Sequence, residues 1–220
     1  RDCQVSGQHG PGDVRMSSDV EAEKREFCEG RISRSIYVSD YAIGQRTRRV
    51  FRTFARVLGG RGTLSDEEKQ IEMENLLAVT RREVVRPLAN SPELIGGSQA
   101  QFDDWHRKAV NQLKARCPIR LAGGSHMTVG MAQKLVNLHC KDLWALDLVP
   151  EKYSMFFHPI IDRVTLRMLD MRLAWTQLDS YRDYMQLQMA LRRLALLSNT
   201  YPLALECHNW NEYRPKRERH

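Results

Sequence analysis

The 220-residue sequence lacks the features that define several large classes of protein. No apolar run approaches the roughly 18 residues that a membrane-spanning helix needs, and the N-terminus has no apolar stretch typical of a signal peptide. The five cysteines are scattered and no pair has CxxC spacing, which argues against a disulfide framework and against a zinc ribbon. We therefore expect a cytoplasmic protein with no membrane partner.

Nucleotide-binding and hydrolase motifs are absent as well. The chain has no P-loop, no GxGxxG, no GxSxG and no HExxH, and its Cys and His residues do not have metal-ligand spacing. We therefore expect neither a cofactor nor a metal ion. These absences leave open whether the protein is an enzyme.

Strand-like alternation is nearly absent too, whereas helix signals recur along the chain. Ser65 and Glu68 have the spacing of a capping box, and Pro159 is suited to the first position of a helix. The predicted helices cover residues 41–58, 65–86, 98 to about 117, 128–148, 159–173 and 180–197. The pattern predicts an all-α fold, an irregular multi-helix bundle of about six helices with little or no β-structure.

Composition changes along the chain divide it into four parts. Residues 1–15 are polar and Gly-rich and precede Met16, so we expect either upstream translation that is not native or a disordered lead of the protein itself. Residues 16–117 form an N-terminal helical region, and a Gly- and Pro-containing break separates it from a C-terminal helical core region over residues 127–213. Residues 214–220 are a basic tail. One bundle and two subdomains are both compatible with this pattern.

A stripe of arginines is the clearest charged feature of this basic chain, whose net charge is +7. The predicted 41–58 helix carries four arginines on one side, namely Arg48, Arg49, Arg52 and Arg56. Apolar residues occupy its other side. No acidic residue occurs between Asp40 and Asp66. Because guanidinium groups match phosphate oxygens, the stripe predicts contact with a nucleic acid. The alternative is a solvated helix face paired with carboxylates of the acidic helix that follows.

Polar side chains on helices that otherwise look buried are the second notable feature. The candidates for a pocket in the C-terminal half are Gln133, Asn137, Lys141, His158, Asp162, Arg192 and Glu206. Buried amides and charges need partners, so these residues either line a ligand site or satisfy neighbouring backbone groups. If these residues serve the structure rather than a ligand, which we call the structural interpretation, Asp162 stabilises a helix N-terminus and Arg192 pairs with Glu206.

Three functions are compatible with these features. The first is a helical binding protein that contacts nucleic acid through the arginine stripe. The alternative is a small-ligand-binding protein or an enzyme of hydrolase or ribonuclease type, with a polar pocket in the C-terminal half. Arg120 and His126 have the spacing found in HEPN ribonucleases, but they lie in a Gly-rich loop rather than on a helix, so we do not assign that family. The third is a homo-oligomer formed through exposed apolar surface.

Overall fold

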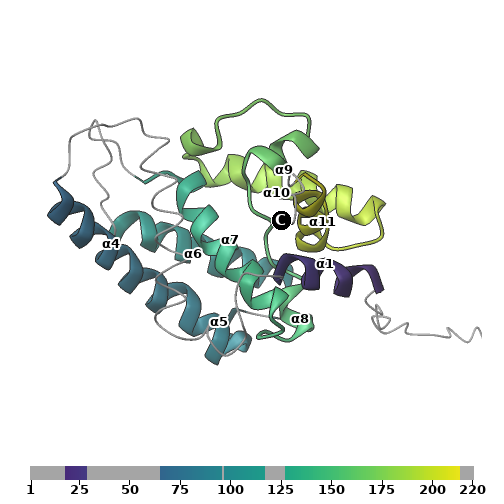
Figure 1. The fold of residues 1–220 in the computed structure, drawn as a ribbon, viewed down its shortest axis with the longest axis horizontal. Helices are drawn as coiled ribbons and strands as arrows, with labels where there is room; N and C mark the ends of the chain where they lie inside the picture. The colour runs from purple at the N-terminus through teal and green to yellow at the C-terminus, as the bar shows by residue number, and fades with distance from the viewer. Residues whose placement is uncertain (1–17, 29–64, 96, 117–126, 214–220) are drawn as a thin grey trace, which may run out of the picture.

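The computed structural model describes residues 18–28, 65–95, 97–116 and 127–213 (Figure 1). This described part is 77% helical and contains no strand, which confirms the all-α prediction. Its α-helices outnumber the six or so expected: α1 (Ser18–Cys28), α4 (Asp66–Thr80), α5 (Arg86–Asn90), α6 (Gln99–Arg116), α7 (Val129–Ala145), α8 (Glu151–Ser154), α9 (Arg163–Met168), α10 (Tyr181–Leu197) and α11 (Pro202–Tyr213).

Helix α7 is the centre of the fold. It lies between α4 to α6 on one side and α1, α9 and α11 on the other (Figure 1), and nearly all of its residues are buried. A helix that is apolar around most of its circumference has to be covered on all sides, which explains this position. Thr128 caps its N-terminus, because the threonine hydroxyl accepts a hydrogen bond from the Met131 amide.

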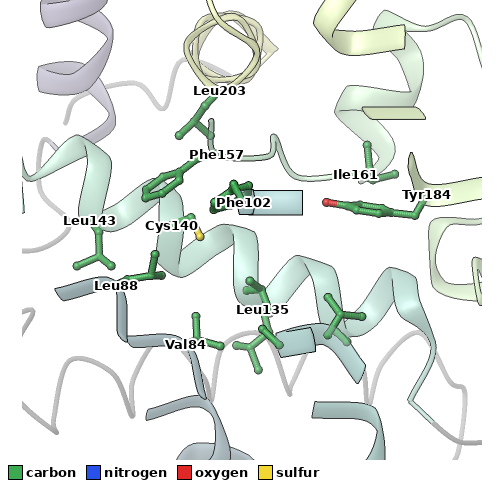
Figure 2. Close-up of a cluster of buried hydrophobic side chains, with 14 of the residues drawn as sticks. Val84, Leu88, Phe102, Leu135, Cys140, Leu143, Phe157, Ile161, Tyr184 and Leu203 are labelled. Carbon is green, nitrogen blue, oxygen red and sulfur yellow. The ribbon is translucent and has the colours of Figure 1, made fainter. Parts of the chain in front are cut away.

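One hydrophobic cluster joins both halves of the described chain. It contains Val84 and Leu88 from the segment before α6, and Phe157 and Leu203 from the C-terminal half, packed around α7 (Figure 2). At the other end of the chain, α1 lies against α11 (Figure 1). Residues of the 16–117 and 127–213 regions therefore share a core.

Two predicted helix starts are confirmed by their caps. At α4 the Ser65 hydroxyl accepts from the Glu68 amide at 3.1 Å, and the Glu68 carboxylate accepts from the Ser65 amide at 2.6 Å. At α10 the Ser180 hydroxyl accepts from the Asp183 amide at 3.2 Å. Both caps satisfy amides that have no partner within the helix, so the side chains define where the helices begin.

The prediction that the 65–86 helix ends before Pro87 was wrong. The chain stays helical through a π-helical turn, Arg81–Val85, and continues as α5 to Asn90. Proline lacks an amide hydrogen and its ring collides with the carbonyl four residues earlier in a regular α-helix. In the wider π turn the Arg86 amide bonds to the Arg81 carbonyl, five residues earlier instead of four. Pro87 then falls in the first turn of α5, where its missing amide hydrogen is tolerated.

The prediction of a helix over residues 159–173 was also wrong. Residues 157–161 are not helical, α9 begins at Arg163 with Asp162 as its cap, and the helix ends at Met168. The backbone of Asp170 is left-handed, with φ of 52°, and this turn stops the helix. Pro159 therefore belongs to a non-helical segment that lies against α7, which we call the 157–161 segment.

Several predictions fall on residues outside the described part. These are the 41–58 helix with Arg48, Arg49, Arg52 and Arg56, the 1–15 lead, the 117–126 break and the 214–220 tail. Among the described helices, none is long and apolar enough to cross a membrane.

Candidate functional site

A cluster of polar side chains lies inside the bundle, where α6, α7, α10 and the 157–161 segment meet. We call it the polar cluster, and its members are Asp103, His106, Gln133, Asn137, His158, Tyr181, Tyr184 and Arg192. Figure 2 shows Tyr184 of α10 with its hydroxyl oxygen turned into the interior. Four of the seven pocket candidates from the sequence belong to the polar cluster: Gln133, Asn137, His158 and Arg192.

The amides of α7 explain how the 157–161 segment can be buried. Gln133 donates to the Ile161 carbonyl at 2.8 Å and accepts from the Ile161 amide at 3.1 Å. The Pro159 carbonyl accepts from Asn137 at 2.9 Å and from Gln188 at 3.0 Å. Buried backbone groups outside helices need such partners, and these side chains supply them. The segment is thereby held against α7, and it carries His158 into the core.

His158 connects the surface of the cluster to its interior. Its Nε2 lies 2.8 Å from Asp103 Oδ1, and its Nδ1 lies 2.8 Å from the Tyr184 hydroxyl. Burial lowers the pKa of His158 to about 4, although Asp103 acts in the opposite direction, so the imidazole is neutral at pH 7. An ionised carboxylate only accepts hydrogen bonds. Arg192 Nη2 also lies 2.9 Å from Nε2 and can only donate, but it already donates to Asp103 Oδ1 at 2.6 Å. We therefore assign the ring hydrogen to Nε2, which donates to the carboxylate, and Nδ1 then accepts from Tyr184.

Asp103 and Arg192 form the solvent-facing end of the cluster. Arg192 donates from Nη1 to Oδ2 at 3.1 Å and from Nη2 to Oδ1 at 2.6 Å, and Gln99 donates to the same carboxylate at 2.9 Å. The two charged side chains are 22% and 24% exposed. Burial favours the neutral acid, but hydrogen bonds from His158 and Arg192 outweigh it and hold the pKa of Asp103 well below its ordinary value.

A second buried histidine lies directly behind the first. His106 Nε2 is 2.7 Å from Asn137 Oδ1, its Nδ1 is 2.9 Å from the Tyr181 hydroxyl, and the His106 and His158 ring centroids are 4.5 Å apart. Burial pushes the pKa of His106 well below its ordinary value. The amide oxygen of Asn137 only accepts, so Nε2 donates to it. His106 also stacks on Tyr184, with ring centroids 5.3 Å apart.

This arrangement forms a chain of hydrogen-bonded groups from the surface into the core. Asp103, His158 and Tyr184 are joined in that order, and the chain is open to solvent only at its Asp103 end, because His158 and Tyr184 are 1% and 0% exposed. A neutral imidazole between a carboxylate and a phenol can take up or release a proton. The members of the polar cluster that meet solvent include Asp103, Arg192 and the partly buried Tyr181.

Lys141 and Glu206 form a separate ion pair. The Lys141 Nζ lies 2.7 Å from Glu206 Oε2, and both side chains are almost completely buried. Burial raises the pKa of Glu206, with Lys141 opposing this shift, and the second carboxylate oxygen has no hydrogen-bond partner. The sequence interpretation that paired Arg192 with Glu206 was therefore wrong. Arg192 reaches Asp103 instead, and Lys141 on α7 neutralises Glu206.

Asp162 also lies outside the polar cluster. Its Oδ1 accepts from the amides of Val164 and Thr165 at 2.9 and 3.4 Å, and its Oδ2 lies 3.1 Å from Lys134 Nζ. It stabilises the N-terminus of α9, as the structural interpretation predicted. The carboxylate that contacts His158 is that of Asp103 rather than of Asp162.

Four members of the polar cluster were not among the sequence candidates: Asp103, His106, Tyr181 and Tyr184. A signal for two of them was present, because Gln99, Asp103 and His106 follow one another at i, i+4 and i+7 and so share one stripe of α6. That stripe adjoins the apolar face of the helix, so the polar side chains of the stripe are expected to be buried. Nothing in the sequence indicated that His158 would reach it.

Among the described residues, no group of three or more His, Cys, Asp or Glu side chains is placed to hold a metal ion. The chain matches no protein-family model, and neither the curated proteins nor the solved structures contain a significant match to it. The functional interpretation therefore depends on the geometry of the polar cluster.

Proposed function

We propose that this protein binds a small zwitterionic molecule at the solvent-facing end of the polar cluster, between Asp103 and Arg192. The observation that carries the proposal is the bidentate pair of these two residues, each about a quarter exposed, above two buried neutral histidines. Charged pairs in front of several buried titratable groups are characteristic of ligand sites.

The charges of the pair select the class of ligand. An anion that bound Arg192 would take away the cation that neutralises Asp103, and a cation on Asp103 would do the same to Arg192. Half-buried charges without a partner are costly. A molecule with both an ammonium and a carboxylate group supplies a partner to each residue, so an amino-acid-like ligand fits best.

His158 would serve as the acid–base group if the ligand is also transformed. It touches Asp103 at 2.8 Å and is neutral at pH 7, so it can exchange a proton with a group that takes the place of the Asp103 carboxylate. Release of a new product in a mixture of protein and ligand, followed by proton NMR, separates an enzyme of hydrolase type from a binding protein.

A calorimetric panel tests the binding proposal. Each of the common L-amino acids is titrated into the full chain, and acetate and ethylammonium are titrated separately as the two halves of a zwitterion. We expect at least one amino acid to bind, and both halves to bind at least about tenfold more weakly, a difference of about 1.4 kcal/mol.

Variants of α6 and α10 provide the control for this panel. D103N and R192Q should each abolish the binding, whereas D104N should leave it unchanged, because Asp104 is exposed and pairs with Arg107 and Lys108 on the surface of α6. Binding that survives in D103N and R192Q, or binding of acetate as tight as that of the amino acid, would contradict the proposal.

Nucleic-acid binding through Arg48, Arg49, Arg52 and Arg56 is a second candidate. It is supported by the absence of acidic residues around this stripe and by the net charge of +7. Duplex DNA binding should weaken steeply with salt, and the pair of substitutions R52E and R56E should reduce both DNA affinity and retention on heparin. Unchanged affinity and retention would remove this candidate.

A further inference from the structure

A second surface feature, remote in sequence from the Asp103–Arg192 pair, lies at the end of α9. Here the surface is hollowed by a cavity of about 440 Å³. The lining residues are Arg163, Leu166, Arg167, Asp170, Met171, Arg172 and Leu173. The cavity lies within the size range of small-molecule sites, about 300–1,000 Å³.

The turn after α9 creates this hollow. Asp170 has a left-handed backbone, its amide donates to the Arg167 carbonyl at 3.0 Å, and the Met171 amide donates to the Leu166 carbonyl at 2.8 Å. These bonds close the helix and redirect the chain. Residues 171–173 thereby line the same hollow as residues of α9, and the backbone rather than a flexible loop holds them there.

The charges of the lining are unbalanced in favour of cations. Three arginines and one aspartate line the hollow, and Arg163 and Arg172 are both exposed. Guanidinium groups that gather at one hollow repel one another unless an anion lies between them, and their planar geometry matches the oxygens of a phosphate group. A phosphate dianion would match the charges of the two exposed arginines Arg163 and Arg172.

An apolar wall completes the hollow. Leu166 is buried and forms its base, whereas Met171 and Leu173 are 43% and 41% exposed. Large apolar side chains at the rim of a cationic hollow favour a ligand with an apolar part beside its charge.

We propose that the hollow at the end of α9 binds a small organic phosphate, a phosphomonoester whose phosphate lies between Arg163, Arg167 and Arg172. The apolar part of this ligand packs on Leu166, Met171 and Leu173. This site shares no residue with the Asp103–Arg192 pair, so each of the two proposals can be tested independently of the other.

Titration calorimetry with three probes tests this proposal on the full chain. The probes are phenyl phosphate, inorganic phosphate and phenol. Phenyl phosphate should bind most tightly, inorganic phosphate should bind more weakly because it lacks the apolar part, and phenol should show no binding. The affinity for phenyl phosphate should increase as the pH rises through about 6, where a phosphomonoester becomes a dianion.

Substitutions at exposed positions locate the binding. The double variant R163Q/R172Q should bind phenyl phosphate at least about tenfold more weakly, since it removes two charge-assisted contacts to the phosphate. R86Q removes an exposed arginine of α5, outside the hollow, and should bind as the wild type does. L173E should also weaken binding, because it places a carboxylate at the rim.

Three results would overturn the proposal. They are no detectable binding of phenyl phosphate, equal affinity of the wild type and R163Q/R172Q, and equal affinity for phenol and phenyl phosphate. Unchanged binding of amino acids in R163Q/R172Q would show that any loss is specific to the hollow.

Discussion

Arg192 of α10 and Asp103 of α6 are 89 residues apart in the sequence and form a bidentate ion pair, with N–O distances of 3.1 and 2.6 Å. The same carboxylate accepts from His158, so one residue of α6 holds both α10 and the 157–161 segment. A ligand that inserted between these two side chains would therefore change contacts of α6, of α10 and of the 157–161 segment.

A double-mutant cycle measures the strength of this pair. D103N and R192Q should each lower the free energy of unfolding by about 1–2 kcal/mol, and their coupling energy should be about 1 kcal/mol, because the pair is bidentate but about a quarter exposed. Urea denaturation of the two single variants and the double variant provides the values. Strictly additive effects would show that the two side chains do not stabilise each other.

Among the buried amide side chains, Asn137 should be the one whose substitution lowers the free energy of unfolding most. Its side chain is 0% exposed and bonds to His106, Gln133, Tyr184 and the Pro159 carbonyl. Asn137→Ala leaves several of these groups without a partner, so we expect a loss of about 3 kcal/mol in urea denaturation. The exposed Asn111 of α6 is the control, and Asn111→Ala should change stability by less than about 0.5 kcal/mol. Similar values for both variants would contradict this account.

The buried pair of Lys141 and Glu206 should respond asymmetrically to substitution. Lys141→Met leaves a carboxylate in the core without its cation and should cost about 3–5 kcal/mol at neutral pH. The variant should recover stability as the pH falls, because protonation removes the buried charge. Lys141→Met combined with Glu206→Leu should restore most of the loss. A double variant as unstable as the single one would show that the pair is needed for packing rather than for charge balance.

The two buried histidines should make stability depend on pH. Burial lowers the pKa of His158 from 6.5 to about 4, and it lowers that of His106 in the same direction. Between these values the unfolded chain binds more protons than the folded chain, so stability is complete above pH 6.5 and falls as the pH drops toward 4. For His158 alone the loss is about 3 kcal/mol.

Urea denaturation at a series of pH values checks this dependence. His158→Gln should reduce the slope of stability against pH between 6.5 and 4, even if the variant is less stable throughout. An identical slope in the wild type and the variant would show that His158 does not change its protonation on unfolding.

Local chemistry made most of the fold predictable. Ser65 and Ser180 begin helices because their hydroxyls satisfy free amides, and this information is contained within four residues of sequence. The helix predicted from Pro159 does not form because the buried amides of α7 bind the backbone of its segment, which is a tertiary effect. At Pro87 the helix continues because the π-helical turn Arg81–Val85 shifts the backbone hydrogen bonds, and Val84, Val85 and Leu88 around it are buried.

The polar cluster was predictable only in part. The amide stripe of Gln133 and Asn137 was visible because polar groups on a largely apolar helix are conspicuous. The partner of Arg192 was not, since Glu206 and Asp103 are both acidic and only the tertiary fold decides which of them the guanidinium reaches. Contacts between distant segments can be predicted only when the fold is known. Burial of a polar stripe can be predicted from the sequence pattern of a single helix.

The imidazole nitrogen spectrum of His158 tests the central claim most directly. In the free protein at neutral pH, ¹⁵N NMR should show a neutral ring with hydrogen on Nε2 and none on Nδ1. On addition of a mixture of the common L-amino acids, the Nε2 resonance should shift, because the ligand ammonium competes for the Asp103 carboxylate that this nitrogen contacts at 2.8 Å. A His158 spectrum that is identical with and without amino acids would contradict the proposal that Asp103 and Arg192 bind a zwitterion.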